Sequence, residues 1–305
     1  MKLSLTVCTR NRADKLTACL DSMAAARARA GLSEAEIVVV DNGSTDGTSD
    51  LTRAWAARTG ESVNLVFEPR AGLSRARNAA LAAVTGEIIA FTDDDCRLDE
   101  NYVVDLLRHD AGDEAPVLRG GRRELGDPED LPISIYTYGS RRVWSRASAE
   151  MKRLGLDGFI AGANMAARRT LFESVGPFDI RLGAGTNLPG GEDTDYYYRT
   201  YQRGFTLEYV PDMAIYHHHG RRDRETARRL YECYWRGRGA LFVKHLFAGA
   251  DYRRPFLHDA KSALIETFSG RRDSLPVTGH SSGEKVLWEL RGALEYVAVA
   301  SAPSS

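Results

Sequence analysis

Short apolar runs alternate with stretches of helical periodicity through the first hundred residues. Between the first two runs, apolar residues recur at helical spacing, at Leu16, Leu20 and Met23. Asp14 precedes them, and an acidic residue favours a helix N-terminus. Strand and helix in alternation predict an α/β fold whose mostly parallel, twisted sheet is flanked by helices. The runs are partly β-branched and typical of buried strands, at residues 3–8, 37–40, 63–67 and 88–91.

A second helix is predicted between the third and fourth strands. It extends from Ser74 through Val84, and Gly86 is expected to stop it at its C-terminal end. The first hundred residues therefore have the pattern of a nucleotide-binding α/β unit.

Polar residues follow each of the four predicted strands, at the edge where parallel sheets bind ligands. Taken singly, such residues are also what surface turns and solvated helix starts carry. Together they predict one polar crevice, lined by Thr9, Arg10, Asn11 and Arg12, by Asp41, Asn42, Gly43 and Ser44, by Glu68, Pro69 and Arg70, and by Asp93, Asp94 and Asp95.

Three adjacent aspartates end the fourth strand, and like charges this close repel unless water or a cation surrounds them. Because strand side chains alternate, Asp93 and Asp95 are expected on one face and Asp94 on the other. Two converging carboxylates suit a hard divalent cation that also binds phosphate oxygens. The chain has no G-x-x-x-x-G-K-[ST] motif and no G-x-G-x-x-G motif after the first strand, so the cation is expected to hold the phosphates.

Composition narrows the class of protein. A chain of 305 residues, 43% of them hydrophobic, can bury a substantial core, most simply as one large domain with appendages. Its 41 basic and 42 acidic residues give a net charge of −1, so no global field predicts a nucleic-acid partner. The four cysteines form no CxxC pair and no disulfide-dense spacing, which favours a reducing compartment, the cytoplasm by default.

No membrane-spanning segment is predicted. The apolar run at the start meets Arg10 and Arg12 too early for a secretory signal, and no stretch of about 18 apolar residues is present. Any membrane attachment is expected to be peripheral, at the inner membrane surface.

Six motifs occur in the order and approximate spacing of the family 2 glycosyltransferases, which adopt the GT-A fold. They are LSLTVCTRNR, IVVVDNGSTDGT, GLSRARNAAL, EIIAFTDDDC, GANMAARR and GGEDTDYYYRTYQRGF. The chain resembles this family over roughly residues 1–220. The resemblance implies a nucleotide-binding half over 1–100 and an acceptor and catalytic half over 101–220.

The resemblance also implies inverting, metal-dependent transfer from a nucleoside-diphosphate sugar. It places the nucleobase on Asp41, with Thr9, Arg10 and Asn11 lining the same pocket. The family's aspartate motif maps to Asp93 for ribose or metal and to Asp95 for the metal, Mn²⁺ or Mg²⁺. Further donor contacts are expected from Asn42, Arg70, Arg77, Asn78 and Asp94.

A flexible Gly190-Gly191 entry leads into Glu192, Asp193 and Asp195 at a predicted helix start. Acidic residues favour helix N-termini for electrostatic reasons alone, by a few tenths to about 1 kcal/mol. In the family, however, this Glu-Asp pair supplies the general base. The resemblance places the base on Asp193, with Glu192 beside it holding the acceptor or the loop.

Three histidines, at 217–219, follow a strand-like run over 207–210. Alternation would place His217 and His219 on one side, although solvated or structural histidines are common. Some members of the family use a histidine here as a third metal ligand, and His217 is the better match. A neutral imidazole beside carboxylates suits Mn²⁺.

Acceptor specificity is expected over residues 120–157. The aromatic residues there, Tyr136, Tyr138 and Trp144, are interpreted as packing residues rather than sugar platforms. Residues 158–168 resemble the family's strand near the donor sugar, where small residues permit close backbone approach, and this resemblance makes Asn164 a candidate sugar contact.

Residues 221–305 depart from the shared core as a C-terminal helical extension. The arginine-rich segment 221–247 is predicted to be a solvated helix packed on the core, with a membrane-surface helix as the alternative. A final helix, which would close the domain or pair two subunits in a homodimer, is marked by Leu287, Leu290, Leu294 and Val297.

UDP is the favoured nucleotide. Asp41 would accept a hydrogen bond from N3–H of uracil or thymine, although guanine N1–H offers the same donor. The acceptor is a carbohydrate, a lipid-linked saccharide or a small molecule. Two other functions are consistent with the pattern. One is a sugar-phosphate nucleotidyltransferase, which would release pyrophosphate, and the other is a catalytically silent sugar-nucleotide-binding protein.

Overall fold

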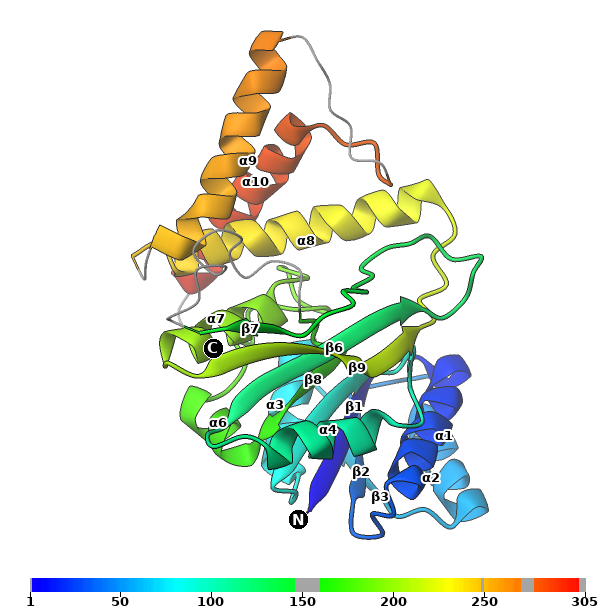
Figure 1. Cartoon of the computed structure of the whole chain (residues 1–305). Helices are drawn as coiled ribbons and strands as arrows, with labels where there is room; N and C mark the ends of the chain where they lie inside the picture. The colour runs from blue at the N-terminus through cyan, green and yellow to red at the C-terminus, as the bar shows by residue number, and fades with distance from the viewer. Residues whose placement is uncertain (1, 146–159, 248–249, 270–276, 302–305) are drawn as a thin grey trace.

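The computed structural model describes residues 2–145, 160–247, 250–269 and 277–301. A twisted sheet crosses the molecule in the order β3-β2-β1-β4-β8-β6-β9-β5, with β7 added against β9 (Figure 1). The strands are β1 (Leu3–Thr9), β2 (Glu36–Asp41), β3 (Val63–Phe67), β4 (Ile88–Asp93), β5 (Cys96–Leu98), β6 (Val117–Leu125), β7 (Arg142–Trp144), β8 (Asn164–Arg168) and β9 (Thr206–His217).

Helices cover both faces of the sheet. The described helices are α1 (Ala13–Arg29), α2 (Thr48–Thr59), α3 (Leu73–Ala83), α4 (Tyr102–Ala111), α6 (Arg169–Val175), α7 (Glu192–Gln202), α8 (Arg224–Lys244), α9 (Ala250–Ser269) and α10 (Ser282–Ala300).

The central strands are apolar on both sides because both faces carry a core. Val38 and Val40 of β2 pack in one cluster with α3, α6 and α7. Ile37 and Val39 pack in a second cluster with α1, α2 and α4. A strand buried on both faces needs an unbroken apolar run, which explains the short apolar runs in the sequence.

Strands β1 to β4 pair in parallel, as the alternation of strands and helices predicts. The sheet becomes mixed beyond β4, where β8 runs antiparallel to it. Two expectations need correction. Strand β3 is the sheet edge and only half-buried, with Phe67 60% exposed. Gly86 does not cap α3; a Cβ there would lie 2.6 Å from the Ser4 backbone nitrogen, so it permits close approach to β1.

Three described helices follow residue 221, and α8 lies between the sheet and the α9–α10 pair (Figure 1). Glycines allow α8 and α10 to cross closely: a Cβ on Gly239 would lie 1.7 Å from the Glu289 carbonyl oxygen. Within the described chain, no helix is long and apolar enough to cross a membrane.

The apolar stripe predicted on the last helix faces outward instead of closing the domain. Helix α10 packs through Glu289, Gly292 and Tyr296, which are buried. The stripe is 47–72% exposed and consists of Leu287, Leu290, Leu294 and Val297. Pairing of two subunits through this stripe stays a prediction.

Candidate active site

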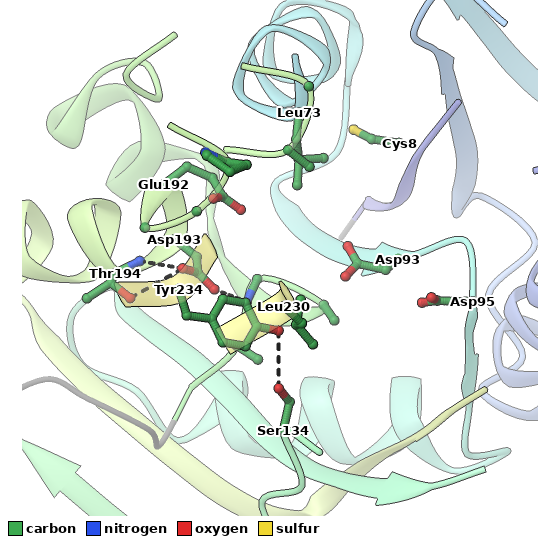
Figure 2. Close-up of a pocket in the computed structure, with 18 of the residues that line it drawn as sticks. Cys8, Leu73, Asp93, Asp95, Ser134, Glu192, Asp193, Thr194, Leu230 and Tyr234 are labelled. Carbon is green, nitrogen blue, oxygen red and sulfur yellow. Dashed lines mark hydrogen bonds between the residues drawn. The ribbon is translucent and has the colours of Figure 1, made fainter. Parts of the chain in front are cut away.

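A cavity of about 620 Å³ opens at the carboxyl ends of β1 and β4, where the sequence predicts a polar crevice (Figure 2). Its volume lies within the range of about 300–1,000 Å³ that is usual for ligand pockets. Strand ends, the N-terminus of α7 and one side of α8 form its walls. Of the residues predicted for the site, those that line it are Thr9, Arg10, Arg12, Asn42, Arg77, Asp93, Asp94, Asp95, Glu192, Asp193 and His217.

Two predicted donor contacts, Asp41 and Asn11, are not among the lining residues. Asp41 is 1% exposed; its carboxylate accepts from the Ser44 backbone N–H at 2.8 Å and from the Ser49 hydroxyl. Asn11 has a left-handed backbone, and its side-chain oxygen accepts from the Thr45 backbone N–H at 2.7 Å. The Asp41 bonds order the segment that follows β2, and the Asn11 bond joins that segment to the loop that follows β1.

Arg70 and Asn78 are also not among the lining residues. Arg70 is exposed and pairs with Glu68 at 2.9 Å. The Asn78 amide donates to the Phe178 carbonyl at 2.9 Å and accepts from its N–H at 2.7 Å. Both side chains are therefore committed to loop structure outside the cavity.

All three aspartates line the cavity, including Asp94, which strand alternation predicts on the opposite face. The prediction fails because β4 ends at Asp93 and the chain turns immediately afterwards. The Thr9 hydroxyl donates to Asp94 at 2.7 Å. Burial raises the pKa of Asp94 to about 7, although the Thr9 hydrogen bond opposes this shift.

Asp95 has the opposite electrostatic environment. Burial alone would raise its pKa, but His217, with Nε2 at 3.2 Å, and Arg12, at 3.7 Å, hold that pKa well below its usual range. Burial raises the pKa of Asp93, against the charge of Arg77 at 3.7 Å.

Ligand atoms of Asp95, Cys96 and His217 lie within 4.8 Å of one another. Burial raises the pKa of the Cys96 thiol well above its ordinary value. Mg²⁺ and Mn²⁺ prefer carboxylate to thiolate ligands, so Asp95 is the better ligand of the two. His217 keeps a buried Nδ1 that has no hydrogen-bond partner among the described residues. The carboxylate and imidazole donors fit a divalent cation.

His219 is differently placed and does not line the cavity. Its Nδ1 accepts from the Arg221 backbone N–H at 2.9 Å, and its Nε2 lies 3.0 Å from the Leu131 carbonyl. A neutral ring protonated on Nε2 satisfies both contacts, which is a structural role. The assignment of the metal ligand to His217 stays a prediction.

Arg77 joins the two predicted catalytic regions. It is 2% exposed, with Nη1 at 3.0 Å from Glu192 and Nη2 at 3.7 Å from Asp93. Gly162 provides the space, since a Cβ there would lie 2.5 Å from Nη2. Burial and the charge of Asp193 raise the pKa of Glu192 to about 7, against the effect of Arg77. Glu192 is thus tied to Arg77 inside the protein.

Asp193 is held with its carboxylate in the cavity wall. Oδ2 accepts from the Gly162 N–H at 3.0 Å, and Oδ1 accepts from the Thr194 N–H at 2.7 Å. Oδ1 also accepts from the Thr194 hydroxyl at 3.3 Å, so Oδ2 is the oxygen that retains a lone pair for an acceptor hydroxyl. In Figure 2, Asp193 lies on the opposite side of the cavity from Asp93 and Asp95.

Helix α8 forms a wall that the sequence does not predict. Its apolar side faces the cavity rather than solvent or a membrane, and the Tyr234 hydroxyl lies 3.2 Å from that of Ser134 (Figure 2). A Cβ on Gly237 would lie 2.6 Å from the Gly190 carbonyl carbon, so α8 touches the loop before α7. The sequence signal that could have indicated this packing is Gly237, which lies beside aromatic residues in the same helix. The lining residues of α8 are Leu230, Tyr231, Tyr234, Trp235, Arg238 and Leu241.

The predicted packing role of the middle aromatic residues is confirmed, because all three pack in or against one core cluster. Trp144 is 1% exposed, and the Tyr138 ring packs edge-on against Tyr209 at 5.5 Å. Tyr136 packs, partly buried, against the same core cluster and also lines the cavity. Residues 146–157 of the predicted acceptor segment lie outside the described residues.

The candidate sugar contact at Asn164 is contradicted. Asn164 is 1% exposed and does not line the cavity. It accepts from the Tyr102 hydroxyl at 3.0 Å and donates to the Met213 carbonyl at 2.8 Å. Through these two hydrogen bonds, Asn164 joins β8 to α4 and to β9.

Comparison with known proteins identifies the class to which this site belongs. The model of Glycosyl transferase family 2 matches residues 4–176, more than half of the chain. The protein is therefore a member of glycosyl transferase family 2, as the ordered motifs predict.

One similar protein is Glycosyltransferase AglE of Haloferax volcanii, which is 25% identical over 208 residues. The match covers 68% of this chain and 64% of AglE, so the chain spans less than two thirds of that relative.

Two solved structures share the fold. S. aureus TarS 1-349 in complex with UDP-GlcNAc has a TM-score of 0.56 at 18% identity, covering 88% of this chain and 73% of that one. The mannosyltransferase PcManGT from Pyrobaculum calidifontis, in complex with GDP-Man and Mn²⁺, has a TM-score of 0.54 at 21% identity, covering 99% and 76%. At these identities the likeness establishes the fold alone, which is GT-A.

Proposed function

We propose that this enzyme transfers a sugar from a nucleoside-diphosphate sugar to an acceptor hydroxyl, with inversion at the anomeric carbon. The observation that carries the proposal is the position of Asp193, whose carboxylate faces Asp93 and Asp95 across one cavity. An in-line displacement needs a base on the side of the acceptor and charge stabilisation on the side of the leaving group.

The residues at the end of β4 fit a divalent cation, Mn²⁺ or Mg²⁺. Asp93 and Asp95 would bind it with His217, whose buried Nδ1 shows that its ring is incompletely satisfied within the described chain. When bound, such an ion neutralises charge on the departing diphosphate. The Mn²⁺ in the PcManGT structure supports this proposal.

Asp193 acts as the general base. It receives the proton of the acceptor hydroxyl as that oxygen attacks the face opposite the departing nucleoside diphosphate, so one displacement inverts the configuration. The backbone N–H groups of Gly162 and Thr194 orient the carboxylate. Glu192 holds Arg77 and thereby the loop, and does not act as the base.

The donor nucleotide is proposed to be UDP, with Asp41 accepting from the base. Asp41 ends β2 directly before the cavity residue Asn42, and each of its oxygens retains a lone pair beyond the bonds from Ser44 and Ser49. The solved neighbours bind UDP-GlcNAc and GDP-Man, which supports a nucleoside-diphosphate sugar without choosing between the bases. Carbohydrate, lipid-linked and small-molecule acceptors all remain candidates.

The test is to incubate the protein with UDP- and GDP-sugars and Mn²⁺ and to measure free nucleoside diphosphate, including its slow release by transfer to water. We expect release that Asp193→Asn strongly reduces. Pyrophosphate release from a nucleoside triphosphate and a sugar 1-phosphate would instead identify a nucleotidyltransferase. Tight sugar-nucleotide binding with no turnover would identify a silent binding protein.

We also propose a reducing, cytoplasmic setting, which the four free cysteines support. Peripheral membrane contact and a homodimer stay predictions. Exposed apolar residues that bear on both are Phe247 at the end of segment 221–247, Leu257, Leu264, Ile265 and Phe268 on α9, and Leu287, Leu290, Leu294 and Val297 on α10.

A further inference from the structure

A buried arginine in the cavity, Arg123, forms no ion pair with any residue that the structure describes. Arg123 is 8% exposed and lines the cavity near the end of β6. Its Nε makes no hydrogen bond, and no ion pair to its guanidinium occurs among the described residues. In the same cavity Arg77 pairs with Glu192, and Arg238 pairs with Asp259. A buried cation without a partner is costly, so Arg123 indicates a missing anion.

The position of Arg123 is built into the fold. The register of β6 against β9 shifts between Gly121 and Arg123, and such irregularities re-aim side chains. Arg123 and Tyr136 exchange two backbone hydrogen bonds, at 2.9 and 3.1 Å. The guanidinium lies over the Tyr136 ring at 4.6 Å, which fixes its plane while its edge donors stay available.

A second cation, Arg221, lines the same cavity. Its backbone accepts from the Leu131 N–H at 2.8 Å and donates to His219, while its side chain forms no ion pair with a described residue. Burial raises the pKa of Tyr234, the charges of Arg123 and Arg221 oppose that shift, and the charge of Asp193 adds to it. The charges of both arginines and of the proposed base therefore all act on the Tyr234 hydroxyl.

We infer that Arg123 and Arg221 bind an anionic group, a phosphate or a carboxylate, carried by the acceptor. The inference rests on the proposed function, because it needs Asp193 to face the acceptor hydroxyl. The acceptor then lies along α8 against Tyr231 and Tyr234, with its anion on the guanidinium groups, whose planar donors match two oxygens of an oxyanion.

The other source of an oxyanion is the donor diphosphate, because the charge of Arg123 also acts on Asp93. Arg12 and Arg77 already stand beside Asp95 and Asp93 on that side. This favours the acceptor as the source, and the two sources can be separated by experiment.

The experiment first measures the binding of UDP and of GDP with Mg²⁺, and then titrates inorganic phosphate into the nucleotide-saturated protein by calorimetry. We expect phosphate to bind the wild type, and Arg123→Gln to weaken it about 10- to 100-fold, as loss of a charged hydrogen bond predicts. Arg221→Gln should weaken it too. The matched control is Arg122→Gln: Arg122 is the neighbour on β6, pairs with Glu124 at 3.0 Å and does not line the cavity.

The nucleotide affinity should be unchanged in all these variants, and Arg123→Lys, which retains the charge, should keep most of the phosphate binding. Phosphate that competes with the nucleotide, with both weakened by Arg123→Gln, would assign the anion to the donor and overturn the inference while leaving the proposed function standing. Failure of phosphate to bind the nucleotide-saturated wild type, or equal binding to Arg123→Gln, would overturn it as well. If neither nucleotide bound the wild type, the proposed function would fall, and the inference with it.

Discussion

The two sides of the cavity are assembled in different ways. The donor wall, which we define as Thr9, Asn42, Asp93, Asp94 and Asp95, comes from residues at or just after the ends of three neighbouring parallel strands. The acceptor wall, defined as Arg123, Ser134, Asp193, Tyr234 and Trp235, brings together four segments distant in the sequence. The donor wall follows from local patterns, whereas the acceptor wall depends on how α8 packs against the core.

The difference predicts that variants of the donor wall change nucleotide and metal binding. The largest effect is expected for Asp95→Ala, which removes a carboxylate beside His217. Even the outer partners of metal ligands contribute about 10- to 100-fold to metal affinity, so loss of a ligand should exceed that and abolish turnover. Metal-dependent UDP binding by calorimetry measures this. Wild-type turnover with unchanged metal dependence would remove Asp95 from the site.

The acceptor wall should behave in the opposite manner. Asp193→Asn removes basicity without changing the size of the side chain, and a positioned base contributes typically about 10² to 10⁴ in rate. We expect that loss in kcat with nearly unchanged donor binding. Steady-state kinetics and UDP calorimetry on the same preparation measure both. A normal kcat would place the base elsewhere.

The third prediction asks whether Asp41, which lies next to the donor wall but does not line the cavity, binds the nucleobase. Asp41→Asn places an amide N–H, a hydrogen-bond donor, opposite the N–H of the nucleobase. An unmet buried hydrogen bond costs about 1 to 3 kcal/mol, which is roughly a five- to hundredfold loss of affinity. The control is Asn78→Ala, which lies outside the cavity and should leave UDP binding unchanged. Equal UDP affinity of wild type and Asp41→Asn would place the base at another residue.

A smaller effect should distinguish the two histidines. His217→Ala should raise the metal concentration that gives half the maximal rate. His219→Ala should mainly lower the free energy of unfolding, because its ring bonds Leu131 and Arg221. Metal titrations of the rate and urea unfolding separate these outcomes. The reverse ranking would move the ligand to His219.

Much of the donor wall could be predicted from the sequence because strands buried on both faces are unbroken apolar runs. Polar residues that follow such runs must gather at one sheet edge, as Thr9, Asn42 and Asp93 do. The prediction failed for Asp94 because alternation holds only within a strand, and β4 ends one residue earlier.

The acceptor wall could not be predicted in the same way. The aromatic side of α8 has the same pattern whether it faces a core, a membrane or a cavity. Only the contact of Gly237 with the loop before α7 selects the cavity. The role of Arg123 could not be predicted either, because the sequence does not show whether an arginine side chain forms an ion pair in the fold. The prediction that Asn164 contacts the sugar was wrong for the same reason. A polar side chain in a strand of small residues can instead hydrogen-bond a neighbouring helix, as Asn164 does with Tyr102.

The central claim is that one displacement occurs between the two walls, with Asp193 as base and the nucleoside diphosphate leaving from the opposite side. The most direct measurement is the proton NMR spectrum of the freshly formed product, taken from a donor of known anomeric configuration. The account predicts the opposite configuration in the product, formed by the wild type and lost with Asp193→Asn. A product that retains the configuration of the donor would contradict it.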